Sequence, residues 1–282
     1  MTARIALAAL FIVPAVMAYP WRSAADRWLL GTAVLAVLVL FAWWRGSFVT
    51  TIVGRRLAMW RRWGHLPLAG ENHTAGTHQS SVYTTTVLLR VDGSNQEPPL
   101  ALIAGYLDRY GIRCDKIRVT SRDLDGLRTT WISLTLRAVD NLTALRARSA
   151  RIPLRETTDV VGRRLADHLR ETGWNVTPVD AADAPVRRDA KETWRGLRDS
   201  SGYVAAYRVD GDLADVRALP SSEIWTALEM TGTADDLRTA AACAIRTHDK
   251  PEAIAGATPL NGRHRPALDA LSPMSVERLT RT

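Results

Sequence analysis

The chain of 282 residues has little of several residue types that carry enzyme chemistry. It contains 2 cysteines and only 3 lysines, Lys116, Lys191 and Lys250, beside 34 arginines. No lysine follows a glycine, so the Gly-Lys-Ser/Thr phosphate loop of a Walker-type motor is absent. The sequence also lacks a Gly-x-Ser-x-Gly elbow, the His-Glu-x-x-His and Cys-x-x-Cys zinc patterns, and a Gly-x-Gly-x-x-Gly turn after a strand. These absences argue against α/β-hydrolases, common zinc enzymes and dinucleotide-binding folds.

The two cysteines lie far apart, in apolar segments that resemble strands. Cys114 and Cys243 are therefore expected to be free, buried thiols of a reducing compartment.

The excess positive charge lies near the N-terminus. The net charge of the chain is +8. Residues 1–63 hold eight arginines and one aspartate, whereas residues 64–282 hold 29 basic and 28 acidic residues. A DNA-binding or RNA-binding surface would need its basic residues on the folded domain, so no nucleic-acid partner is predicted.

Two apolar runs of equal length and without charge, Ile5–Trp21 and Trp28–Trp44, predict a transmembrane hairpin. A helix of about 17 residues is about 26 Å long, and flanking arginines can reach the headgroups of a bilayer core of about 30 Å. A cleaved signal peptide is the alternative for the first run, but a second run follows at once and Pro20-Trp21 suits signal peptidase poorly.

A basic flank follows the second run and sets the expected orientation. Its arginines are Arg45, Arg55, Arg56, Arg61 and Arg62, with no acid among them. The positive-inside rule then places both termini of a two-pass membrane protein in the cytoplasm. The segment 47–63 is expected to continue the second span as a juxtamembrane helix or to lie on lipid headgroups, or it is simply a stop-transfer flank.

Residues 64–81 are rich in Gly, Ser, Thr and His and predict a linker to a cytosolic domain over 82–282. Alternation and turn residues predict strands over 82–91, 113–120, 127–138, 174–179, 203–210, 222–230 and 237–247. Helices are predicted over 100–110, 141–150, 157–172 and 212–219. Residues 180–198 and 253–282 are expected to be irregular. The fold class is therefore α/β or α+β with a mixed sheet.

A short sequence recurs at the ends of two predicted strands. Arg90-Val91-Asp92-Gly93 returns as Arg208-Val209-Asp210-Gly211. This hints at two similar halves, but Asp-Gly is a common strand terminator, which is the interpretation we favour from the sequence.

Two groups of side chains are candidates for metal chemistry. Asp123-Leu124-Asp125 resembles the Asp-x-Asp of glycosyltransferases, although Gly126 also makes it a natural hairpin turn. His65, His73 and His78 lie within fourteen positions, but their spacing matches no familiar ligand pattern, so an exposed polar linker is the simpler interpretation. No metal or cofactor is predicted.

Several segments together resemble the EccE family of the actinobacterial type VII (ESX) secretion system. They are IVPAVMAYPW, WLLGTAVLAVLVLFAWW, SFVTTIVGRRLAMWRR, VYTTTVLLRV, GYVAAYRVDG and TPLNGRHRPAL. The short chain is most similar to the type that serves siderophore and metal acquisition.

This resemblance implies an inner-membrane subunit without a catalytic site, held beside EccB, EccD and the ATPase EccC in a larger hetero-oligomer. The expected function is a non-catalytic structural subunit. The first alternative is a membrane-anchored nucleotide-sugar or lipid transferase that uses Asp123 and Asp125. The second is a metal-sensing linker that uses His65, His73 and His78.

Overall fold

The structure of the protein is a computed structural model, and it divides the chain into two compact units, Met1–Pro67 and Leu68–Thr282. It describes residues 83–279 apart from 93–95, 150–151, 188 and 234–235. Nearer the N-terminus it describes Val13, Thr32, Trp43, Trp44, Ser47 and Phe48. The rest of the predicted hairpin and the whole predicted linker lie outside the described residues.

The first unit shows a chain reversal just after the second apolar run. Strands β1 (Trp43–Trp44) and β2 (Ser47–Phe48) pair antiparallel, with Trp43 opposite Phe48 and Trp44 opposite Ser47. Trp43 and Trp44, the last two residues of the second apolar run, therefore lie in a strand. The rest of the predicted span and of the segment 47–63 stays a prediction. Among the described residues, no helix is both long enough and apolar enough to cross a bilayer.

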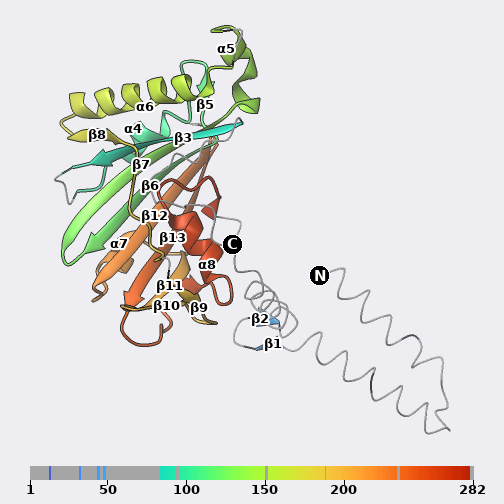
Figure 1. The fold of residues 1–282 in the computed structure, drawn as a ribbon, viewed down its shortest axis with the longest axis vertical. Coiled ribbons are helices and arrows are strands. Elements are labelled where there is room, and N and C mark those ends of the chain that lie inside the picture. Colours follow the sequence, from blue (N-terminus) through green and yellow to red (C-terminus); the bar gives the residue numbers. More distant parts are fainter. Residues whose placement is uncertain are drawn as a thin grey trace. The chain divides into compact units, whose positions relative to one another are not determined.

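The second unit is built on a ten-stranded sheet (Figure 1). Nine strands follow the order β8-β3-β7-β6-β12-β13-β11-β10-β9, and β14 also pairs with β11. Their bounds are β3 Thr84–Val91, β6 Lys116–Leu124, β7 Leu127–Arg137, β8 Val176–Val179, β9 Lys191–Glu192, β10 Leu197–Asp199, β11 Gly202–Val209, β12 Glu223–Gly232, β13 Leu237–Thr247 and β14 Ala257–Pro259. Strands β4 (Asp108–Arg109) and β5 (Ile112–Arg113) form a separate small pair.

Every strand pair in the described part of the chain is antiparallel, so the prediction of a mixed sheet is wrong. Tight hairpins explain this outcome. Asp125 and Gly126 both adopt positive φ, 50° and 82°, and close β6 onto β7 in a two-residue turn. Such a turn matches the twist of antiparallel strands, whereas parallel neighbours would need long crossovers. The domain is therefore of the α+β kind.

The sheet order reveals two similar halves. Strands β3, β7 and β6 of the first half are mirrored in order by β11, β13 and β12 of the second, and β6 pairs with β12 at the centre. The recurring Arg-Val-Asp-Gly sequence lies at the ends of the equivalent strands β3 and β11. Arg90 pairs with Asp92 and Arg208 with Asp210.

Threonines from neighbouring strands complete this similarity. Thr177 of β8 donates to Asp92, and Thr258 of β14 donates to Asp210. The structure therefore favours internal similarity over a chance recurrence of a strand terminator.

The helices differ from prediction at two places. The bounds are α4 Leu100–Ala104, η1 Val139–Asn141, α5 Leu142–Arg146, α6 Leu154–Glu171, α7 Leu213–Arg217 and α8 His264–Leu271. The helix predicted over 100–110 ends at Ala104, because the chain turns through Tyr110 and Gly111, both at positive φ, between β4 and β5. The tail predicted to be irregular contains α8. Its Pro266 lies in the first turn, where a missing N–H costs no helical hydrogen bond.

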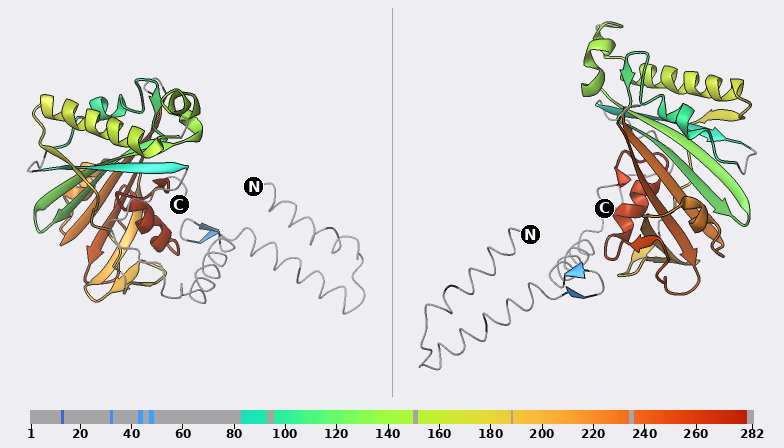
Figure 2. Two further views of the ribbon diagram at one scale, coloured as in Figure 1. Left: turned by 45° about the horizontal axis from the view of Figure 1, so that its top comes forward. Right: turned by 180° about the vertical axis from the view of Figure 1, so that it is seen from behind.

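Helices cover both faces of the sheet. Leu89 of β3 belongs to the apolar cluster that contains Leu165 of α6, whereas Leu88 belongs to the cluster that contains Leu268 of α8. Figure 2 shows α6 and α8 on opposite sides of β3. Side chains that alternate along β3 therefore enter two different cores, which is why most positions of this strand are buried, including Thr85 and Thr86. Cys114 and Cys243 are free and buried, as predicted, and burial raises both thiol pKa values to about 12.

Candidate functional site

The residues singled out near the membrane segments lie outside the described residues. These are the basic flank Arg45, Arg55, Arg56, Arg61 and Arg62, and the linker histidines His65, His73 and His78. Their predicted roles stay predictions.

Asp123 and Asp125 occupy the hairpin between β6 and β7. The Nε of Arg128 donates to Oδ1 of Asp123 at 2.7 Å, across the hairpin. Asp125 holds the first position of the turn itself, and its N–H donates to the carbonyl of Ser222 at 3.3 Å. Within the described part of the chain, no three His, Cys, Asp or Glu side chains gather as metal ligands. The geometry thus assigns both aspartates to shaping and closing the hairpin.

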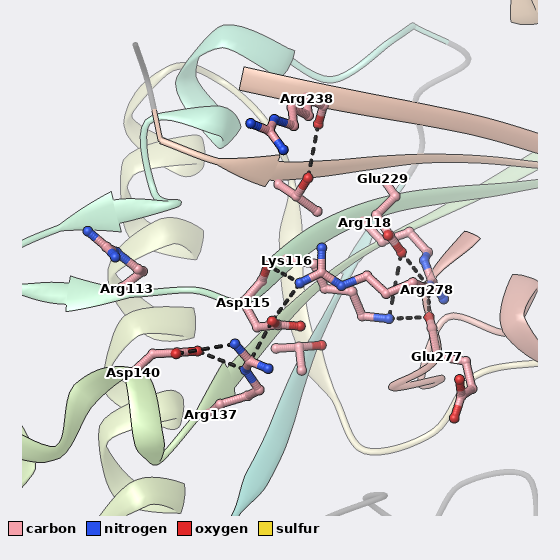
Figure 3. A network of polar contacts seen from close by, with 12 residues as sticks. Arg113, Asp115, Lys116, Arg118, Arg137, Asp140, Glu229, Arg238, Glu277 and Arg278 are labelled. Carbon is pink, nitrogen blue, oxygen red and sulfur yellow. Dashed lines mark hydrogen bonds and ion pairs between the residues drawn. The ribbon is translucent and has the colours of Figure 1, made fainter. Parts of the chain in front are cut away.

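The most unusual site in the domain is a pair of buried cations at the start of β6 (Figure 3). The side chains of Lys116 and Arg118 are 1% and 0% exposed, and they share one carboxylate, Glu229 of the neighbouring strand β12. Nη2 of Arg118 lies 2.7 Å from Oε2 of Glu229, and Nζ of Lys116 lies 3.7 Å from the same oxygen. Two positive charges therefore share a single buried counter-charge.

Backbone carbonyls of the C-terminal tail supply the remaining acceptors. Lys116 Nζ donates to the carbonyl of Ser275 at 2.9 Å and also to that of Glu277. Arg118 donates to the carbonyls of Ala270, Ser272, Ser275 and Glu277. The tail after α8 is thus held by charge-assisted hydrogen bonds from β6, which are stronger than neutral ones.

Burial of this network lowers the pKa values of both of its cations. Burial and the nearby Arg118 charge lower the pKa of Lys116 to about 7, although Glu229 opposes the shift. Burial likewise lowers the pKa of Arg118, again against Glu229. A buried side chain stays charged only when an opposite charge or hydrogen-bond acceptor lies close to it. Lys116 and Arg118 therefore need the carbonyls of the tail, and the tail needs their hydrogen bonds to stay on the sheet.

The network continues outward to the surface. Asp115, whose side chain is 8% exposed, accepts from Arg278 of the tail at 2.6 Å and pairs with Arg137 of β7 at 3.1 Å. Arg137 in turn pairs with Asp140 of η1, which raises the pKa of Arg137. The chain of contacts therefore runs from the solvent-exposed end of β7 to the core.

A second ionic cluster lies on the same face, nearer the other end of the sheet. Glu223 accepts from Arg122 and Arg246, and Arg246 also reaches Asp199 of β10. Burial acts to raise the pKa of Glu223, but the Arg246 hydrogen bond and the Arg122 charge hold it below its usual value. These contacts link β6, β12, β13 and β10, so they fasten the two halves together.

A cleft of about 530 Å³ opens between the halves. The segment before α4 and the start of α7 form its walls, and Val119, Ser121 and Leu228 of the central strands contribute to its floor. Arg217 of α7 pairs across it with Glu97. The size suits a small ligand or a few peptide residues. Its lining includes the carboxylates of Glu97, Asp210 and Asp212 and the hydroxyl of Ser121. Glu97 is paired with Arg217, and Asp210 is paired with Arg208.

Sequence reasoning missed the buried network. In the sequence, Lys116-Ile117-Arg118-Val119 alternates charged and apolar residues, a pattern that indicates a strand with one solvated face. The tail covers that face instead. Glu229, 111 positions from Arg118, gave no local signal of the pairing.

Comparison with known proteins yields a consistent result. A family model described as "Putative type VII ESX secretion system translocon, EccE" matches residues 125–209. The "ESX-3 secretion system protein EccE3" of Mycolicibacterium smegmatis (strain ATCC 700084 / mc(2)155) is 54% identical over 291 residues, covering 100% of this chain and 91% of that protein. The protein of the same name from Mycobacterium tuberculosis (strain CDC 1551 / Oshkosh) is 46% identical, covering 98% of this chain and 86% of its own length.

Proposed function

The chain belongs to the EccE family, and on that premise we propose that it is a non-catalytic structural subunit of a type VII (ESX) secretion complex in the inner membrane. Residues 1–63 anchor the chain in the membrane with both termini in the cytoplasm. The domain of strands β3–β14 makes protein contacts beside the translocon ATPase. The partners are EccB-, EccC- and EccD-like subunits, and the relatives' ESX-3 name favours the metal-acquisition type of system.

One observation carries this proposal: the similarity to ESX-3 proteins extends over essentially the whole chain, including the apolar runs. The geometry of the domain supports it. The conspicuous charged side chains of the sheet, such as Arg118, Arg246 and Glu223, are used in internal ion pairs.

The test is affinity purification of the tagged full-length protein in mild detergent, followed by mass spectrometry. We expect a membrane ATPase to co-purify with EccB- and EccD-like proteins. A chain that lacks residues 1–63 should lose both the membrane and these partners. A matched control is the Asp125→Asn variant of the full chain, which alters the Asp-x-Asp sequence and should keep every partner. Recovery of the full-length protein alone would contradict the proposal.

A further inference from the structure

Exposed apolar side chains gather at one end of the sheet. We call it the Tyr83 end: β3, β6 and β13 begin there, and β7 and β12 end there. Register places these ends together, since Thr84 pairs with Arg137, Ile117 with Met230, and Gly232 with Leu237. Figure 1 shows α5 at the same end, beside the start of β3, and η1 lies between the end of β7 and α5 in the chain.

Three large apolar residues lie exposed at this end. Tyr83 is 75% exposed, Val139 is 66% exposed and Leu237 is 44% exposed. The carbonyl of Tyr83 accepts from the N–H of Ala138, which makes Tyr83 and Val139 near neighbours. The opposite end exposes Leu127 at the tip of the β6–β7 hairpin. Leu237 lies on β13, four strands away from β3 in the sheet order, so Tyr83 and Val139 are the neighbouring pair. Neighbouring exposed apolar groups mark a contact with another surface.

Some arginines at the Tyr83 end are in ion pairs with aspartates, and others have no ion pair among the described residues. Arg113, Arg137 and Arg238 each pair with an aspartate. Arg146 and Arg148, at the end of α5 and just beyond it, are exposed and have no ion pair among the described residues. Two uncompensated guanidinium groups beside exposed tyrosine and valine make a surface that is both basic and apolar.

The position of Tyr83 in the chain, just after the predicted linker, indicates that this surface contacts the membrane. The predicted linker leads directly into Tyr83 from the basic flank of the predicted span. The predicted tether therefore enters the domain at the Tyr83 end. A tethered surface is held at high effective concentration, so a weak contact suffices.

We propose that the Tyr83 end docks on anionic phospholipid headgroups. Guanidinium groups bind phosphate in a bidentate manner, which suits Arg146 and Arg148. Tyrosine and aliphatic side chains favour the interface between headgroups and acyl chains. This docking rests on the membrane anchoring in the proposed function, and it fixes which surface of the domain faces the membrane and which strand edges remain open to partner subunits.

The experiment uses the full-length protein in nanodiscs of phosphatidylcholine alone or of an equal mixture with phosphatidylglycerol. Hydrogen–deuterium exchange is followed over residues 137–149. We expect slower exchange there in the anionic discs, with loss of the difference at high salt. The double variant Arg146→Gln/Arg148→Gln should weaken docking about thirtyfold and abolish the difference. The matched control Arg195→Gln/Arg198→Gln removes the same charge from the exposed β9–β10 region and should retain it.

Equal exchange in both lipids would overturn the proposal. Protection that appears only when partner subunits are added, whatever the lipid, would also overturn it and assign the surface to a protein contact. Retention in the disc and co-purification of partners are scored in the same preparations. If docking fails while the protein stays in the discs and still co-purifies with its partners, the proposed function stands. If the protein is absent from the discs, the anchoring itself is refuted.

Discussion

Substituting glutamine for Glu229 removes one negative charge from beneath the C-terminal tail and leaves the size of the side chain nearly unchanged. In the native protein this carboxylate contacts Arg118 at 2.7 Å and Lys116 at 3.7 Å, and all three side chains are at most 1% exposed. The carbonyl oxygen of the glutamine amide can still accept hydrogen bonds, but the amide carries no compensating charge. Both cations would then be buried with only tail carbonyls as partners.

The expected cost follows from that burial. Removing one partner of a buried ion pair typically costs about 3–5 kcal/mol, because the remaining charge is left without compensation. For a domain of this size, each kcal/mol lowers the midpoint of thermal unfolding by about 2–4 °C, so the midpoint should fall by about 6–20 °C. The tail should loosen first, since Ser275 and Glu277 accept directly from these cations.

The assay is thermal unfolding of the full-length protein in detergent, followed by near-ultraviolet circular dichroism. The matched control is Asp236→Asn, which removes the same charge from the exposed pair with Arg238. Many exposed ion pairs contribute nothing measurable to stability. If the two variants unfold at the same temperature, the buried network does not hold the tail and the reasoning is refuted.

Three further outcomes are expected. Burial lowers the pKa of Lys116 to about 7 in the folded protein, so between about pH 7 and 10 the unfolded chain binds more protons than the folded chain. The free energy of unfolding should therefore rise with pH in that window, by at most about 1.4 kcal/mol per pH unit. Urea unfolding of Lys116→Met should lack this rise, and the same pH dependence in both proteins would contradict the prediction. Gly162→Ala places a Cβ 2.8 Å from Cγ1 of Val87 and should lower the free energy of unfolding by about 1–3 kcal/mol. The double variant Val87→Ala/Gly162→Ala should recover stability, because it removes the clashing methyl group. Urea midpoints measure both effects. Asp125→Asn should keep the hairpin, because asparagine also accepts positive φ in this turn; metal-dependent nucleotide binding by the parent, lost in this variant by calorimetry, would revive the transferase alternative.

Local signals in the sequence located most of the elements. The apolar, β-branched run that ends at Asp92-Gly93 predicted a strand, and β3 spans Thr84–Val91. Asp125-Gly126 predicted a hairpin, and the two residues adopt the positive φ values that such a turn requires. The prediction over 237–247 matches β13 residue for residue. These features depend on neighbours within a few positions, and so can be read without knowing the fold.

The family was also predicted from the sequence, and the mycobacterial relatives confirm it. The two-pass topology and the roles of the basic flank stay predictions, since those residues lie outside the described part of the chain. The recurring Arg-Val-Asp-Gly sequence does stand at two strand ends, as the favoured interpretation has it. The equivalent positions of β3 and β11 in the sheet are what favour an internal similarity, and the sequence alone did not show them.

By itself, then, the sequence determined the long strands, the β6–β7 hairpin, the family and the concentration of excess positive charge near the N-terminus. It was wrong about the short strands, because β9 and most of β10 lie in the segment 180–198 and β14 lies in the segment 253–282, both predicted to be irregular. The tertiary structure decided the antiparallel order, the joining of two similar halves at β6 and β12, and the burial of Lys116 and Arg118. The physical reason is distance along the chain. Alternation shows that Lys116 and Arg118 share one face of a strand, but whether that face meets water depends on Glu229 and on a tail at the far end of the chain.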